Sequence, residues 1–133
     1  MTKPGFIPMI ATACLMLGAP VWANGDAAQG EKVFKKCVAC HTVGEGQPSR
    51  MGPNLHNVFG RKVGTLEGFS FSPTYKAAGE AGDVWTPERF TDFIAQPRAM
   101  YGGGRMVLQI ADEGDRTDLL AFLMQHSPAF EAE

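Results

Sequence analysis

The stretch KKCVACHTVG, residues 35 to 44, contains two cysteines and a histidine within five positions. Side chains of this kind at this spacing hold a redox disulfide, a zinc ion or a covalently attached haem. Each use requires a different environment, because a thioredoxin-like disulfide sits in a βαβ unit and a closed zinc site needs four donors. The rest of the chain therefore decides what Cys37, Cys40 and His41 hold.

The remaining sequence argues against a redox disulfide and against a zinc site. Alternating runs rich in Val, Ile and Thr are missing and the periodic segments have helical spacing, so no βαβ unit is predicted. Cys37, Cys40 and His41 supply only three zinc donors, and no second CxxC or HxxxH completes a set. The CxxCH pattern of c-type haem attachment remains. We therefore expect one haem c per chain, bound covalently through Cys37 and Cys40, with His41 on the iron.

The first residues differ in composition from the rest of the chain. Only one charged residue precedes Asp26, an apolar run extends from residue 6 to residue 17, and Ala23 ends a short stretch of the kind that a signal peptidase reads. We interpret residues 1–23 as a signal peptide, cleaved after Ala23, and residues 24–133 as a single domain that is exported to the periplasm.

A membrane anchor that is not cleaved is the alternative, since the apolar stretch is nearly long enough to span a bilayer, although prolines interrupt it. Lipid attachment at Cys14 is another, but the residues before this cysteine lack the usual leucine. If the leader is removed, Cys37 and Cys40 are the only cysteines left. The formal net charge of the whole chain is −2, and loss of Lys3 makes it −3, which argues against nucleic acid as a partner.

Start and stop signals predict helices separated by long loops. A capping box at Asp26 and Gln29 starts the first helix, whose apolar face continues to Cys37. Further helices are expected in the ranges 72–79, 86–96 and 117–124, the last with a cap at Asp112 or Asp115. The stretches 42–71 and 97–113 are rich in Gly and Pro and are predicted to be loops. Such long loops in a small domain need something to pack against, and a haem provides that apolar nucleus.

Several ordered motifs in residues 24–133 resemble those of the class I cytochromes c, the group of the mitochondrial electron carrier and its soluble bacterial relatives. They are GEKVF (30–34), CVACH (37–41), GPNLH (52–56), FGRKVG (59–64), Trp85, Gln96-Pro97, GGRM (103–106) and DLLAFL (118–123). The resemblance implies an all-α cytochrome c fold, in which the N- and C-terminal helices cross and short helices and long loops wrap around one haem c. Gly30 is then expected to permit close approach of the face that carries Leu119 and Phe122.

The sixth iron ligand of an electron carrier is expected to be methionine, a soft donor that suits both Fe(II) and Fe(III). The resemblance places this ligand after a Gly-x-x-Met approach, which assigns it to Met106. Met100 is the main alternative, followed by His56 and His126. The residues expected to line the haem pocket after the ligand are Val107, Leu108 and Ile110.

The resemblance also implies roles for three residues around the haem. The carbonyl of Pro53 is expected to accept the Nδ1 proton of His41 and so to leave Nε2 for the iron. The indole of Trp85 and the guanidinium of Arg61 are expected to donate hydrogen bonds to a buried haem propionate, whose charge is costly unless it is paired.

The chain departs from the mitochondrial-type pattern at four positions. Phe71 and Phe93 stand where that pattern has tyrosines, so two hydroxyl groups are absent. Gly102 replaces a proline and Gly104 a threonine in the ligand loop, which leaves three consecutive glycines before the ligand. Because glycine raises backbone freedom, we expect Met106 to be held less firmly than in the mitochondrial-type protein.

These features predict a carrier of single electrons rather than an enzyme, because both axial positions are filled and no catalytic constellation is visible elsewhere. The resemblance implies redox protein partners in a bacterial respiratory or photosynthetic chain, such as a cytochrome bc-type complex, a terminal oxidase or reductase, or a reaction centre. A monomer would meet these membrane complexes by peripheral contact. The cations expected to ring the exposed haem edge are Lys35, Lys36, Arg61, Lys62, Arg98 and Arg105.

Two other functions remain open at this point. A haem peroxidase or gas-binding sensor would use the glycine-rich loop to release the methionine ligand from the iron. A fixed electron-transfer subunit of a dehydrogenase complex would expose a long apolar patch for its partner. The sequence has no dedicated motif for either, and it does not specify the electron donor and acceptor.

Overall fold

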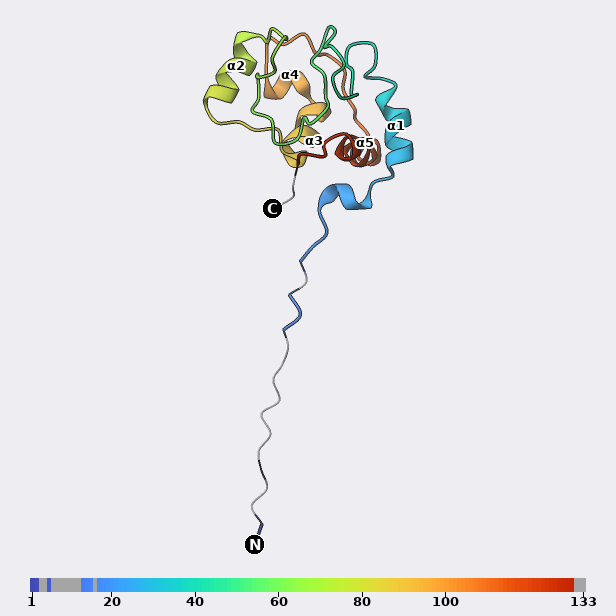
Figure 1. The fold of residues 1–133 in the computed structure, drawn as a ribbon, viewed down its shortest axis with the longest axis vertical. Coiled ribbons are helices and arrows are strands. Elements are labelled where there is room, and N and C mark those ends of the chain that lie inside the picture. The colour runs from blue at the N-terminus through green and yellow to red at the C-terminus, as the bar shows by residue number, and fades with distance from the viewer. Residues whose placement is uncertain (3–4, 6–12, 16, 131–133) are drawn as a thin grey trace.

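The computed structural model describes residues 1–2, 5, 13–15 and 17–130 (Figure 1). The apolar run predicted for the signal peptide, residues 6–17, lies mostly outside the described residues. The elements, in chain order, are the 3-10 helix η1 (Val21–Asn24) and the α-helices α1 (Ala27–Phe34), α2 (Pro73–Glu80), α3 (Pro87–Ala95), α4 (Pro97–Met100) and α5 (Glu113–Gln125). Each helix in the described part of the chain is too short or too polar to cross a bilayer.

The described residues form an all-α fold, as the sequence predicts. The β-type pairing among them is limited to an isolated antiparallel bridge between Lys62 and Val84. Long irregular segments connect α1 to α2 and α4 to α5. Figure 1 shows α1 and α5 next to each other on one side of the domain, α2 on the other side, and α3 and α4 between them.

The predicted cap of α1 is present, but it is completed from a distant part of the chain. The side chain of Asp26 accepts hydrogen bonds from the backbone nitrogens of Ala28 and Gln29 at 2.8 and 3.1 Å. In a capping box the Gln29 side chain would accept the backbone N–H of Asp26. That N–H instead donates to Oδ1 of Asp118 on α5 at 2.8 Å, so the two terminal helices share one cap.

The later helices begin where their caps predict, with one exception. Thr86 caps α3 through the backbone nitrogen of Arg89 at 3.1 Å. Asp112, and not Asp115, is the N-cap of α5, because its Oδ1 accepts the Asp115 backbone N–H at 2.8 Å. The prediction of a loop after Pro97 is wrong for its first turn, which is α4. Proline stops α3 because it lacks a donor, yet the same residue is well suited to the first position of a new helix.

The crossing of α1 and α5 depends on the absence of a side chain at Gly30. A Cβ atom at this position would lie 2.6 Å from the carbonyl carbon of Asp118 and 2.8 Å from Cβ of Phe122. On either side of the contact, Phe34 packs on Phe122 with ring centroids 5.2 Å apart, and Leu119 is only 1% exposed. The expected role of Gly30 is thus present, with the backbone of Asp118 as the closest neighbour.

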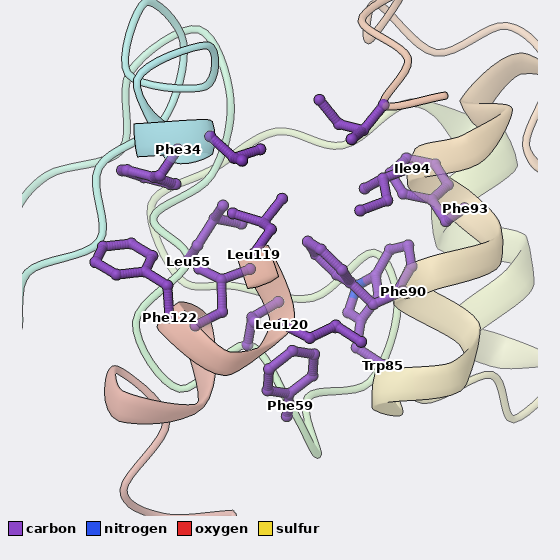
Figure 2. Close-up of a cluster of buried hydrophobic side chains, with 14 of the residues drawn as sticks. Phe34, Leu55, Phe59, Trp85, Phe90, Phe93, Ile94, Leu119, Leu120 and Phe122 are labelled. Carbon is purple, nitrogen blue, oxygen red and sulfur yellow. The ribbon is translucent and has the colours of Figure 1, made fainter. Parts of the chain in front are cut away.

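Figure 2 shows a second group of buried side chains, on and beside α3, facing those of α5. Trp85 packs edge-on against Phe93 with ring centroids 4.9 Å apart, and Phe59 packs against Phe90 at 5.6 Å. Aromatic pairs in such edge-to-face geometry add attraction to their burial. The core therefore consists of two groups of packed side chains, one between α1 and α5 and one on the aromatic face of α3.

We predict that Gly30→Ala destabilises the protein, although the same change inside an exposed helix is favourable by about 0.5–1 kcal/mol. The added methyl group would push α1 away from α5, and overpacking of this kind costs about 1–3 kcal/mol. Denaturant unfolding followed by far-UV circular dichroism measures the change. Glu31→Ala, at the exposed next position of the same helix, is the control. Greater stability of the Gly30→Ala protein would contradict the proposed crossing.

Candidate functional site

The two motif cysteines lie on hydrogen-bonded turns that directly continue α1. The backbone nitrogen of Cys37 donates to the carbonyl of Phe34 at 2.7 Å, and those of Cys40 and His41 donate to the carbonyl of Cys37 at 3.1 and 2.9 Å. Both thiols are free, and Cys37 packs against the hydrophobic core. Burial raises the pKa of Cys37 to about 11, although Lys36 acts in the opposite direction. At neutral pH this thiol is therefore protonated and is not a reactive thiolate.

His41 is oriented by the backbone of Pro53. Its Nδ1 lies 2.8 Å from the carbonyl oxygen of Pro53. Because a carbonyl can only accept, Nδ1 must carry the proton, which leaves the lone pair on Nε2 available to a metal. Burial lowers the pKa of His41, and the hydrogen bond to Pro53 opposes this shift only in part.

Gly52 makes the close approach of the imidazole possible. A Cβ atom at this position would lie 2.7 Å from Nδ1 and 2.8 Å from Nε2 of His41. The backbone nitrogen of Gly52 donates to the carbonyl of Cys40 at 2.8 Å, which ties the Gly-Pro segment to the motif turn. The sequence GP at positions 52 and 53 thus supplies both the space for the ring and its hydrogen-bond acceptor.

Asn54 holds the loop between the motif and Pro53, a role that the sequence reasoning missed. Its buried side-chain amide donates to the carbonyls of Gly44 and Gln47 at 2.9 and 2.6 Å, and its Oδ1 accepts from the backbone nitrogen of His56 at 2.7 Å. Buried backbone carbonyls need such partners where no helix or sheet supplies them. The only signal in the sequence was an asparagine in a stretch without predicted secondary structure. The hydrogen-bond partners of Asn54 depend on the path of the loop, which the sequence does not show.

Arg61 is directed inward and lacks a carboxylate partner among the described residues. Its Nη1 donates to the carbonyl of Asn54 at 2.9 Å and its Nη2 to that of His56 at 2.6 Å. Burial lowers the pKa of Arg61, which means that the environment disfavours its charge. A half-buried guanidinium that is bound only to carbonyls suits an additional anion, such as a haem propionate.

Trp85 lies beside Arg61 because the backbones of the two segments pair. The backbone nitrogen of Trp85 donates to the carbonyl of Arg61 at 2.8 Å, and the nitrogen of Gly60 donates to the carbonyl of Trp85 at 2.8 Å. The indole is 8% exposed and packs against Phe93. The structure thus places the backbones of the two residues predicted to contact a propionate side by side, and the contact of their side chains with a propionate stays a prediction.

Ser72 was not predicted as a site residue, but its hydroxyl lacks a hydrogen-bond partner among the described residues, as do the buried hydroxyls of Thr91 and Ser127. It is the N-cap residue of α2, yet its side chain makes no capping hydrogen bond. Within the described part of the chain its Oγ is buried and has no partner. A buried hydroxyl without a partner is costly, so this one fits an acceptor that a bound group would supply. A serine before a proline usually indicates a helix cap, so the sequence predicted a capping role for Ser72 and not a binding role.

Met106 and Met100 are both half-buried and pack against the same hydrophobic core as Cys37. Of the residues expected to line the pocket after Met106, Ile110 is buried and Leu108 is half-buried. Val107 is 64% exposed, and its expected place in the haem pocket stays a prediction.

These groups fit one covalently bound haem. Among the described residues, the thiols are unpaired, the histidine presents Nε2, an inward guanidinium has no acid partner and a buried hydroxyl has no acceptor. The model of the cytochrome c family matches residues 27–127. The chain therefore belongs to the cytochrome c family, whose members carry haem c.

Individual relatives narrow the comparison within the family. Cytochrome c2 iso-2 of Rhodospirillum centenum is 41% identical over 119 residues, which cover 79% of this chain and 98% of that protein. Cytochrome c-550 of Ancylobacter novellus is 43% identical over 97 residues, covering 72% of this chain and 91% of that protein. The solved structure of cytochrome c2 from Rhodospirillum centenum matches with a TM-score of 0.73 at 42% identity, covering 78% of this chain and 100% of that chain. The cytochrome c fold predicted from the sequence is thereby confirmed.

We predict that Gly52→Ala disturbs the orientation of His41. The methyl group would occupy the space of the imidazole, so the hydrogen bond to Pro53 should lengthen and the protein should lose about 1–3 kcal/mol of stability. Denaturant unfolding and the spin state in the optical spectrum of the haem-loaded protein measure the two effects. Met51→Ala, at the neighbouring exposed position, is the control. If the variant has the spectrum and the stability of the wild type, the proposed role of Gly52 in orienting His41 is refuted.

Proposed function

We propose that this protein is an exported monohaem c-type cytochrome that carries single electrons between redox proteins. Cys37 and Cys40 attach the haem, and His41 and Met106 are its axial ligands. The observation that carries this proposal is the arrangement of His41, whose Nδ1 is held by Pro53 while Nε2 remains available beside the two free thiols. Met106 and Met100 both pack against the same hydrophobic core as Cys37, and the Gly-x-x-Met resemblance favours Met106 as the second ligand.

The haem supplies a centre that changes its oxidation state by one electron. The chain supplies two ligands, so an axial position for substrate is not left open, and this favours a carrier over an enzyme. Arg61, Trp85 and Ser72 are proposed to bind the propionates, because Arg61 lacks an acid partner and the Ser72 hydroxyl lacks an acceptor in the described part of the chain. Neutralising buried carboxylates in this way stabilises the bound group.

The family and the predicted leader support the proposals on export and partners. Residues 1–23 are proposed to be removed, and residues 24–133 to act in the periplasm as a monomer. The relatives named cytochrome c2 and cytochrome c-550 support a soluble carrier of a bacterial electron-transfer chain. The proposed partners are a cytochrome bc-type complex and a terminal oxidase, a reductase or a reaction centre, which the carrier meets at the membrane surface.

Five of the six cations expected around the haem edge are exposed, namely Lys35, Lys36, Lys62, Arg98 and Arg105. Arg61 does not belong to this group, because its guanidinium is bound to the carbonyls of Asn54 and His56. Lys36 also approaches Asp115 at 3.5 Å, but both side chains are solvent-accessible and such pairs are weak. We infer that the exposed cations steer the carrier toward acidic partners.

Met106→Ala is expected to abolish the sulfur-to-ferric-iron charge-transfer band and to let the ferrous protein bind carbon monoxide. Mass analysis of the exported protein reports leader cleavage and haem addition in the same sample, and both should match the wild type. Met100→Ala is the matched control and should keep the band. Loss of the band in Met100→Ala instead would assign the ligand to the other methionine, and carbon monoxide binding by the wild type would favour a sensor or a peroxidase.

The rate of electron transfer to an acidic partner complex is expected to fall as salt is added. Electrostatic steering acts between exposed charges and is screened over about 10 Å at 0.1 M ionic strength. Stopped-flow reduction or oxidation at increasing salt measures this dependence. Lys35→Gln should lower the rate at low salt and flatten its dependence on salt. A rate that does not change with ionic strength would rule the steering out.

A further inference from the structure

Tyr101 connects α4 to the three glycines that precede Met106, and its side chain is tightly held. It is 6% exposed, and its hydroxyl donates to Oδ2 of Asp83 at 2.7 Å. The same hydroxyl accepts from Nη1 of Arg89 at 3.2 Å, and Arg89 pairs with the same oxygen of Asp83 at 3.0 Å. The start of the loop is thus bound to the segment before α3 and to the first turn of α3.

Asp83, which accepts the hydrogen bond from Tyr101, is itself held in place by backbone hydrogen bonds. The backbone nitrogen of Asp83 donates to the carbonyl of Ala78 on α2 at 3.0 Å, and its carbonyl accepts from Val63 at 2.9 Å. Burial and the hydrogen bond to Asp83 raise the pKa of Tyr101, and Arg89 opposes this shift. The phenol therefore keeps its proton at neutral pH and remains a donor to a rigid partner.

A second tyrosine covers the other end of the glycine stretch. Tyr75, on α2, has its ring centroid 5.3 Å from that of Tyr101 and 6.1 Å from that of Phe93. A Cβ atom at Gly104 would lie 2.8 Å from the hydroxyl oxygen of Tyr75 and 3.0 Å from its Cζ. The glycine at this position is therefore required by an aromatic ring that occupies the space of a side chain.

We propose that Tyr101 and Tyr75 form a clamp that holds the Met106 loop in place of the proline and the threonine absent from it. Tyr101 fixes the start of the loop through Asp83 and Arg89, and the Tyr75 ring covers Gly104 two residues before the ligand. The inference rests on the proposed role of Met106 as iron ligand, and it adds the groups that hold this ligand. The clamp offsets the backbone freedom that three consecutive glycines introduce.

Tyr101→Phe tests the anchor, because it removes the hydroxyl and keeps the ring. Added imidazole competes with Met106 for the ferric iron, so its apparent affinity reports how easily the loop releases the ligand. We expect this affinity to rise about tenfold, as for the loss of a hydrogen bond to a charged group. The charge-transfer band of the ferric protein should weaken in parallel.

Gly30→Ala distinguishes a specific effect on the loop from general loss of stability. It is expected to destabilise the α1–α5 crossing, which is remote from the clamp in sequence and shares none of its residues. At an equal loss of stability, its imidazole affinity should stay within about twofold of the wild type, since distant sites act independently. An increase as large as that of Tyr101→Phe would reduce Tyr101 to an ordinary structural residue and overturn the proposal.

Two glycine variants of the same loop test the role of the Tyr75 ring. Gly104→Ala would force a methyl group into the ring and should raise the imidazole affinity in the same direction as Tyr101→Phe. At Gly102 a Cβ would meet its nearest neighbour, the carbonyl oxygen of Arg98, at an ordinary 3.7 Å. Gly102→Ala should therefore leave the affinity close to that of the wild type. Equal effects of the two variants would contradict the contribution of Tyr75.

The wild-type spectrum separates failure of the clamp from failure of the ligand assignment. If the charge-transfer band is missing from the wild type, or survives in Met106→Ala, the assignment of Met106 fails and the clamp proposal fails with it. If the band depends on Met106 but Tyr101→Phe binds imidazole as the wild type does, the clamp alone is overturned.

Discussion

The contact of α1 with α5 at Gly30 is the constraint on which the rest of the structure depends. It brings together segments about ninety residues apart in the chain, and the hydrogen bond from Asp26 to Asp118 joins their ends. The CxxCH turns follow α1 without interruption, so the position of α1 on α5 also sets the position of Cys37 and His41. Closing such a long loop is entropically costly, and buried residues such as Leu119 and Phe122 offset that cost.

Between α1 and α2 the chain is held mainly by polar side chains rather than by secondary structure. Asn54 and Arg61 bind backbone carbonyls of the loops, and Pro53 and Gly52 position the imidazole of His41. No helix or sheet supplies donors to these carbonyls, so the side chains take that role. The same residues that fold the loops therefore also shape the haem site, and structure and function are difficult to separate by mutation in this region.

The glycine-rich loop shows how far sequence reasoning reached. The residues GGRM led to the assignment of Met106, and their glycines indicated freedom of the backbone. Gly103 does have a φ of +80°, which favours glycine, but Gly104 is constrained by the ring of Tyr75. A glycine that permits close contact and a glycine that permits motion look identical in a sequence. Only the neighbours, which come from α2 and from the segment before α3, distinguish the two.

The sequence by itself determined the haem motif, the all-α class and the starts of most helices, because these depend on residues a few positions apart. Asp26, Thr86 and Asp112 are caps whose hydrogen bonds reach only two or three residues along the chain. The tertiary structure alone decided the partners that lie far away, such as Asp118 for the Asp26 amide and Asp83 for Tyr101. Local rules follow from the geometry of one turn of backbone, whereas these pairings form only when the folded chain brings distant side chains within hydrogen-bonding distance.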